Sequence, residues 1–126
     1  MKSIIRDLTE IIGPSSYEEL VADAIEKMIK KNKNLEIKRD VMGNLIARKR
    51  GGGKKIMIAA HMDEIGFMVK HIDKNGFLRF AVVGGIFNHN IIENHVKFTS
   101  GVEGVIGVES KSFNWKDIPS ADKMFI

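Results

Sequence analysis

A continuous apolar run near the middle of the chain passes directly into polar residues: Ile56-Met57-Ile58-Ala59-Ala60-His61-Met62-Asp63-Glu64. A short apolar run of this kind is typical of a strand that is buried on both faces, as in the centre of an α/β sheet. Open α/β sheets bind their ligands beside the carboxyl ends of the strands. We therefore expect His61 to lie at the carboxyl end of a central strand.

The spacing of His61 and Asp63 suits a metal ligand and a supporting carboxylate. Residues i and i+2 of an extended segment point to the same side, so the two side chains share one face. A carboxylate beside a metal-bound imidazole fixes its tautomer and raises its basicity. The same spacing is also compatible with a purely structural polar pair. Glu64 points to the opposite face of an extended segment, so we do not assign it to the chemistry.

The residues before this run predict two helices and a hairpin. Apolar residues at helical spacing between positions 4 and 12 predict a first helix that ends at Gly13-Pro14. A second helix follows over residues 20–29. Two serines stand three residues before two glutamates at its start, a pattern typical of a capping box: Ser15, Ser16, Glu18 and Glu19. Alternating apolar residues then predict strands at 35–39 and 45–47 around a Gly43-Asn44 turn.

From Ile65 onward the pattern is that of a small β domain. Strands are predicted at 67–72 and 77–83, and shorter ones on either side of Ser100-Gly101, with a further strand starting at Met124. Closely spaced short strands with glycine turns favour a small barrel or sandwich. The sequence therefore predicts an α/β part over residues 1–65 and a β part over residues 66–126.

Composition restricts the class of protein. The chain has 126 residues, of which 44% are hydrophobic, and it contains no cysteine, so disulfides and thiolate metal sites are excluded. It has neither a signal-peptide core nor an apolar run long enough for a bilayer, and a cytoplasmic location is the default expectation. The net charge of +4 comes from scattered basic residues without an aromatic platform between them. This favours a solvated surface over a nucleic-acid-binding barrel, which stays open as a weaker alternative.

Several segments resemble one family of enzymes. Residues 56–69 closely resemble the segment that carries the first metal ligand in the tetrahedral-particle (glutamyl or deblocking) aminopeptidases, whose members often bear the name endoglucanase or cellulase. Residues 13–18 resemble the entry to the second helix of that family, although Ser16 stands where glycine is more usual. Further landmarks follow in the family's order: the Asp40–Ile46 hairpin, and residues 75–80, 83–85 and 104–107 of its inserted β domain.

The resemblance implies a fold, an activity and roles for two residues. It implies the N-terminal part of a phosphorylase/hydrolase-like α/β catalytic domain (1–65), followed by part of a β-barrel dimerisation domain (66–126). The family is metal-dependent, uses two divalent ions such as zinc or cobalt, and removes residues from the amino end of peptides. Its members form dimers through the β domain and then dodecamers. By this resemblance His61 is a metal ligand and Asp63 is the catalytic carboxylate that supports it.

The resemblance also has departures. The family usually shows proline and histidine after the position of Gly107, where Val108–Lys111 stands here, and it places the general base and most ligands beyond residue 126. We therefore expect an N-terminal portion that is inactive alone and binds metal weakly, because catalytic zinc sites use about three protein ligands. We also expect it to self-associate or fold poorly, because the apolar strand predicted at 56–60 needs helices on both faces and this chain supplies only two. The alternative is a non-catalytic truncated product or an oligomerisation module. An adventitious metal site of His89, Glu93 and His95 stays open. Phe113 and Trp115 are interpreted as core or interface residues.

Overall fold

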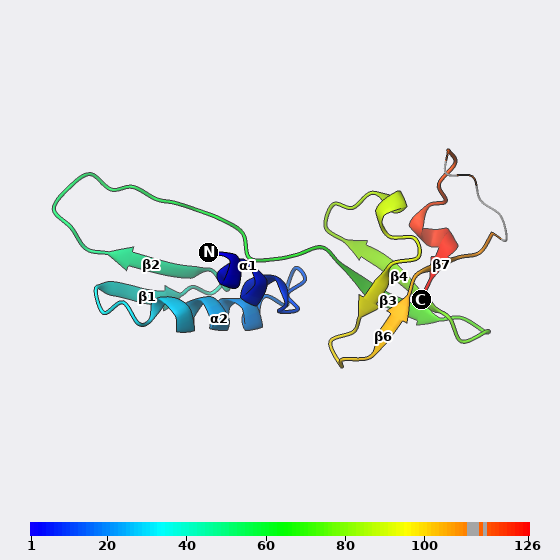
Figure 1. Ribbon diagram of the computed structural model, residues 1–126, viewed down its shortest axis with the longest axis horizontal. Helices are drawn as coiled ribbons and strands as arrows, with labels where there is room; N and C mark the ends of the chain where they lie inside the picture. Colours follow the sequence, from blue (N-terminus) through cyan, green and yellow to red (C-terminus); the bar gives the residue numbers. More distant parts are fainter. Residues whose placement is uncertain (111–113, 115) are drawn as a thin grey trace. The chain divides into compact units, whose positions relative to one another are not determined.

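The chain folds as a mixed α/β protein in two compact units. The computed structural model describes residues 1–110, 114 and 116–126, so the interpretations placed on Lys111, Phe113 and Trp115 lie outside the described residues. Unit 1 is Met1–Glu64 and unit 2 is Ile65–Ile126. Figure 1 shows the two α-helices in unit 1 and strand pairs in both units, and the pairs are antiparallel. Among the described residues, no helix has the length and apolarity needed to cross a bilayer.

Both predicted helices of unit 1 are present. Helix α1 (Lys2–Thr9) ends earlier than the apolar pattern predicts, and the N–H of its C-cap residue Glu10 donates to the Arg6 carbonyl oxygen. This helix has no buried residue. Helix α2 (Glu19–Ile29) buries Val21 and Ala22 and is the better anchored of the two.

The predicted capping box at the start of α2 is wrong. Neither serine caps the helix, whose N-cap is Glu18. The Glu18 carboxylate instead accepts a hydrogen bond from the Ser16 backbone N–H at 2.8 Å. Ser16 has a φ of +74°, which a residue without a Cβ adopts most easily. This backbone turn explains why glycine is the more usual residue there.

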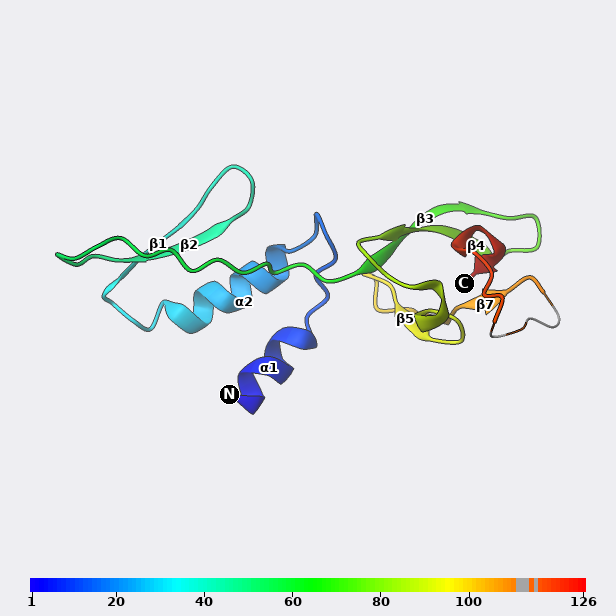
Figure 2. The same ribbon diagram turned by 90° about the horizontal axis from the view of Figure 1, so that it is seen from above.

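The predicted hairpin is confirmed, and it is tied to α2. Strands β1 (Leu35–Arg39) and β2 (Leu45–Lys49) pair antiparallel. The Arg39 guanidinium reaches two carboxylates of α2, Asp23 at 2.5 Å and Glu26 at 3.0 Å. Figure 2 shows α2 beside this hairpin. The ion pairs therefore join the helix to the strands on the surface of unit 1.

The predicted central strand at residues 56–60 is wrong for the described chain. This run is not assigned to a strand, and Ile56, Met57 and Ile58 are each more than 85% exposed. A strand requires a neighbour that accepts and donates its backbone hydrogen bonds. No described strand pairs with this run, so it is an unpaired segment. His61 therefore follows an exposed run rather than a strand of a sheet.

Unit 2 is an antiparallel β unit, as predicted. Asp73–Gly76 turns β3 (Gly66–Ile72) into β4 (Leu78–Val83). The remaining described elements are two further strand pairs and two short 3₁₀ helices: β5 (His95–Lys97) with β6 (Glu103–Val105), β7 (Gly107–Val108) with β8 (Met124–Phe125), η1 (Asn88–Asn90) and η2 (Ala121–Lys123). The described strands thus form pairs, and a closed barrel is not part of what the structure shows.

Five buried side chains form the core of unit 2: Phe80, Ile91, Ile92, Ile106 and Met124. Helix η1 leads directly into the buried pair Ile91 and Ile92. Gly107 lies against the ring of Phe125, and a Cβ at that position would stand 2.7 Å from the Phe125 Cζ atom. Close packing therefore requires glycine beside β8.

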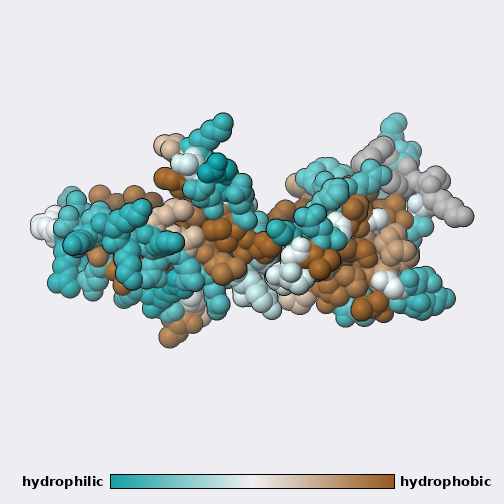
Figure 3. Space-filling view, turned by 60° about the horizontal axis from the view of Figure 1, so that its bottom comes forward, coloured by the Kyte–Doolittle hydropathy of each residue, from teal (hydrophilic) through white to brown (hydrophobic). Residues whose placement is uncertain are grey.

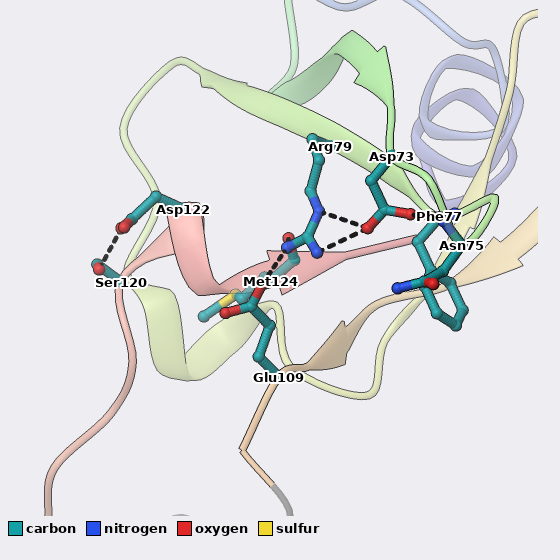
Figure 4. Close-up of polar contacts among 8 residues, drawn as sticks. All are labelled: Asp73, Asn75, Phe77, Arg79, Glu109, Ser120, Asp122 and Met124. Atoms are coloured by element: carbon teal, nitrogen blue, oxygen red, sulfur yellow. Dashed lines mark hydrogen bonds and ion pairs between the residues drawn. The ribbon is translucent and has the colours of Figure 1, made fainter.

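An ion-pair network links the β3–β4 turn to the last strands of unit 2 (Figure 4). The Arg79 guanidinium contacts Asp73 at 2.8 Å and Glu109 at 2.7 Å, and it donates to the Met124 carbonyl oxygen at 3.4 Å. The guanidinium lowers the pKa of Asp73 from its usual value, while the Asp73 carboxylate raises the pKa of Arg79. The network holds the turn against the strands around Met124.

Candidate metal-binding site

His61 and Asp63 lie in the expected contact. The Nδ1 atom of His61 is 3.0 Å from Oδ1 of Asp63 and 3.1 Å from the Asp63 carbonyl oxygen. The His61 side chain is 86% exposed and that of Asp63 is 37% exposed. An Nδ1 atom that faces two oxygen acceptors carries the proton in the neutral ring. The lone pair is then on Nε2, the nitrogen that would face a metal ion.

Ser15 is the residue that the sequence interpretation missed. Its hydroxyl donates a hydrogen bond of 2.5 Å to Oδ2 of Asp63. Each oxygen of the Asp63 carboxylate therefore has its own donor, one from Ser15 and one from His61. These two hydrogen bonds hold the pKa of Asp63 below its usual value, and the hydrogen bond from Ser15 contributes the larger part of the decrease. Nothing in the sequence signals this contact, because the two residues are 48 positions apart.

A pair of hydrogen bonds holds the Ser15 loop against the segment of Asp63. The Glu64 N–H donates to the Gly13 carbonyl oxygen at 2.9 Å, and the Gly13 N–H donates to the Glu64 carboxylate at 2.9 Å. Pro14 and Glu64 form a parallel bridge. Gly13 is buried against Val21 of α2, and a Cβ at Gly13 would collide with the Cγ2 atom of Val21. The helix thus fixes the loop, and the loop fixes the segment that ends at Glu64.

A cavity of about 460 Å³ lies within unit 1 beside His61 and Asp63. The N-terminal turn of α2, the β1–β2 turn and residues 60–63 line it. Arg39 is the basic residue of this lining, and the acidic residues outnumber it: Glu18, Glu19, Asp23, Asp40 and Asp63. A surface with this excess of carboxylates attracts cations.

No complete metal site is formed by the described residues. Among residues 1–110, 114 and 116–126, no group of three histidine or acidic side chains could hold an ion together. This includes His89, Glu93 and His95, so the adventitious site considered from the sequence is not formed. The ring of His89 instead stacks on Phe87, with their centroids 5.7 Å apart. An imidazole with a supporting carboxylate suits a divalent ion such as zinc, and His61 with Asp63 fits that requirement for one position.

Comparison with known families decides the identity of the chain. The sequence model of the M42 glutamyl aminopeptidase family matches residues 43–125. The chain belongs to the M42 glutamyl aminopeptidase family. A putative aminopeptidase from Acetivibrio thermocellus is 48% identical over all 126 residues, which cover 38% of that relative. The chain thus spans less than half of the length of this relative.

Two solved structures share the fold of this chain. The TET1 peptidase of Pyrococcus horikoshii, described as able to assemble into a tetrahedron or a large octahedral shell, superimposes with a TM-score of 0.79 at 33% identity over 96% of this chain and 38% of its own. A Thermotoga maritima protein named endoglucanase has a TM-score of 0.77 at 34% identity, over 94% of this chain and 36% of its own. The resemblance to the tetrahedral-particle aminopeptidases, including the endoglucanase name, is therefore confirmed.

Proposed function

We propose that this M42 chain contributes to a metal-dependent aminopeptidase that removes residues from the amino end of peptides. In this proposal His61 binds one of two divalent ions, zinc or cobalt, and Asp63 is the carboxylate that orients it. The observation that carries the proposal is the 3.0 Å contact between His61 Nδ1 and Asp63 Oδ1. Membership of the M42 family and the acidic cavity beside His61 support it.

Each residue has a definite task in this proposal. Asp63 accepts a hydrogen bond from the Nδ1–H of His61, which leaves the lone pair on Nε2 for a metal ion. The carboxylates around the cavity provide a negative environment that favours a cation near His61. When bound, the two ions would polarise the scissile carbonyl and activate a water molecule.

A zinc titration of the 126-residue chain tests the role of His61. The titration follows the imidazole signals by NMR. We expect weak binding centred on His61, because a single protein ligand holds zinc poorly. The His61→Ala variant should lose this binding. The matched control is His71→Ala, which removes an exposed histidine from β3 of unit 2. Equal zinc binding by the His61→Ala variant and the unchanged chain would contradict the assignment.

An activity assay tests whether the chain works alone. We propose that it does not turn over aminoacyl chromogenic substrates with zinc or cobalt added, because no group of three histidine or acidic side chains among the described residues could hold an ion. Turnover that copurifies with the chain and disappears in His61→Ala would show that the remaining ligands lie within these residues.

Residues 1–65 and 66–126 have separate roles in this proposal. The first part belongs to the catalytic α/β domain, and the second to a β-barrel dimerisation domain in a dodecameric, cytoplasmic enzyme. Two observations support self-association: the TET1 relative assembles into closed shells, and apolar side chains reach the surface in both units (Figure 3). An oligomerisation module without activity is the second candidate, and the same surfaces favour it.

Sedimentation tests the self-association. We expect oligomers or poorly folded material at micromolar concentration, because several exposed apolar residues of unit 1 have no cover within it. A monodisperse monomer with a sharp cooperative unfolding transition would contradict this proposal.

A further inference from the structure

We infer that Ser15 is a positioning residue that acts through Asp63 on His61. The Ser15 hydroxyl holds one oxygen of the Asp63 carboxylate at 2.5 Å, and the other oxygen lies 3.0 Å from Nδ1 of His61. The inference deepens the proposed function, since it rests on His61 as a metal ligand. It assigns Ser15 the task of fixing the plane of the carboxylate and, through it, the orientation of the imidazole.

The exposure of His61 makes such support necessary. With a side chain 86% exposed, His61 has few packing contacts that restrict its ring. An exposed histidine–carboxylate pair is weak alone, because water competes for both groups and two side chains must be ordered at once. A second hydrogen bond to the same carboxylate restricts the rotation of the Asp63 side chain before a metal ion binds, so that only the imidazole is left to be ordered.

Ser15 is held more firmly than the pair that it supports. Its loop is fixed to the segment of Asp63 by the two hydrogen bonds between Gly13 and Glu64, and Gly13 packs on the buried Val21. Ser15 itself is half-buried. Helix α2 therefore fixes the loop that contains Ser15. Ser15 in turn positions the Asp63 carboxylate, which orients the His61 ring. Such a supporting layer is what keeps a metal ligand in its productive geometry.

A helix-capping role does not account for the Ser15 hydroxyl. The N-cap of α2 is Glu18, and no side chain caps the first turn. The hydroxyl that the sequence pattern assigns to the helix is instead used on a carboxylate 48 positions away. The neighbouring Ser16 makes its contact with Glu18 through the backbone N–H, so its hydroxyl is not part of this arrangement.

The experiment measures the tautomer of His61 without metal and then its zinc affinity. Long-range ¹H–¹⁵N NMR spectra of the 126-residue chain, recorded at about pH 8 where free imidazole is neutral, report which ring nitrogen carries the proton. We expect the Nδ1–H form to dominate in the unchanged chain and to lose that dominance in Ser15→Ala. Zinc titration should then show up to about a tenfold loss of affinity, at the lower end of what supporting residues of metal ligands contribute. The control is Ser16→Ala, which should behave like the unchanged chain.

A second pair of variants separates the hydroxyl from the shape of the side chain. Thr and Val have the same shape, and only Thr keeps the hydroxyl. Ser15→Thr should retain the tautomer and the zinc affinity, and Ser15→Val should match Ser15→Ala. If Thr and Val behave alike, or if Ser15→Ala leaves both readouts unchanged, the inference is overturned.

The two readouts distinguish this inference from the proposed function. If zinc binding does not depend on His61, the proposed function fails, and the metal-free tautomer still decides the role of Ser15. If zinc binding depends on His61 and the tautomer does not depend on the Ser15 hydroxyl, the proposed function stands and the inference about Ser15 fails.

Discussion

The two units of the chain are stabilised by different interactions, unit 2 by a buried apolar core and unit 1 mainly by polar contacts. Unit 2 encloses a cluster of five buried side chains, among them Met124, which has no exposed surface. Within residues 1–64, all of which the structure describes, the buried residues are Val21, Ala22 and Gly13. Unit 1 is instead held by polar contacts, such as those of Arg39 with α2 and of Gly13 with Glu64. The candidate site thus lies in the unit with the smaller core.

The comparison teaches where changes in sequence should matter. Apolar burial contributes about 25 cal/mol per Å² to the free energy of folding. It does not depend on the orientation of the groups in contact, so a core such as that of unit 2 stabilises many residues at once. Hydrogen bonds contribute less in total but fix particular groups. Unit 1 therefore depends on a few specific contacts, and the substitutions below test this difference.

The largest expected effect is that of Met124→Ala in unit 2. Truncation of a fully buried methionine leaves a cavity, and we expect a loss of about 2–5 kcal/mol in the free energy of unfolding. Chemical denaturation followed by NMR signals of β3 and β4 measures it.

Met57→Ala in unit 1 is the matched control for this prediction. It makes the same substitution at a side chain that is 89% exposed, and it should change the free energy of unfolding by less than about 0.5 kcal/mol. Equal losses in the two variants would mean that the run 56–60 is buried in solution, and the contrast between the units would fail.

A smaller effect, confined to unit 1, is expected for Gly13→Ala. The added Cβ would collide with Val21 Cγ2, and overpacking of this kind costs about 1–3 kcal/mol. Hydrogen exchange should show faster opening of α2 and of the Gly13–Glu64 contact, with unit 2 unchanged. Gly52→Ala is the control, because nothing lies within 4 Å of a Cβ there.

A second substitution separates packing from backbone effects at Gly13. The double variant Gly13→Ala with Val21→Ala removes the atom that the new Cβ meets. Faster exchange that persists in the double variant, beyond the cost of Val21→Ala alone, would show that the collision is not the cause.

The smallest effect concerns pH and two similar turns. Asp40 in unit 1 and Asp73 in unit 2 each accept hydrogen bonds from the amides two and four residues later. Contacts with Asn44 lower the pKa of Asp40, and those with Arg79 lower the pKa of Asp73. A lowered pKa in the folded chain stabilises it above the usual pKa of aspartate. That contribution is lost as the pH falls through the folded value.

We expect Asp73→Asn to reduce the stability of unit 2 at neutral pH and to flatten its loss of stability in acid. Asp40→Asn should act in the same direction on unit 1 but less strongly, because Asp40 pairs with a neutral amide and Asp73 with a guanidinium. Thermal unfolding between about pH 2 and 7, with NMR probes in each unit, measures both. A larger effect at Asp40 would reverse the ranking.

Some features were determined by the sequence alone, because the contacts behind them are local. The hairpins at 35–49 and 66–83 form where an aspartate stands three residues before Gly43 and Gly76, and both strand pairs are confirmed. His61 and Asp63 meet because two residues of an extended segment share a face. The order of the motifs along the chain was sufficient to indicate the family.

Other features were decided only by the tertiary structure. The run 56–60 has the composition of a buried strand, yet a strand forms only with a pairing partner, and no described strand pairs with it. Ser15 fits a helix cap by local spacing, yet its hydroxyl bonds Asp63 because the backbone at Ser16 turns and Gly13 is fixed to Glu64. Neighbours in sequence reveal contacts of a few residues. A hydrogen bond between residues 48 positions apart depends on how the intervening chain packs. The spacing of residues in the sequence does not predict that packing.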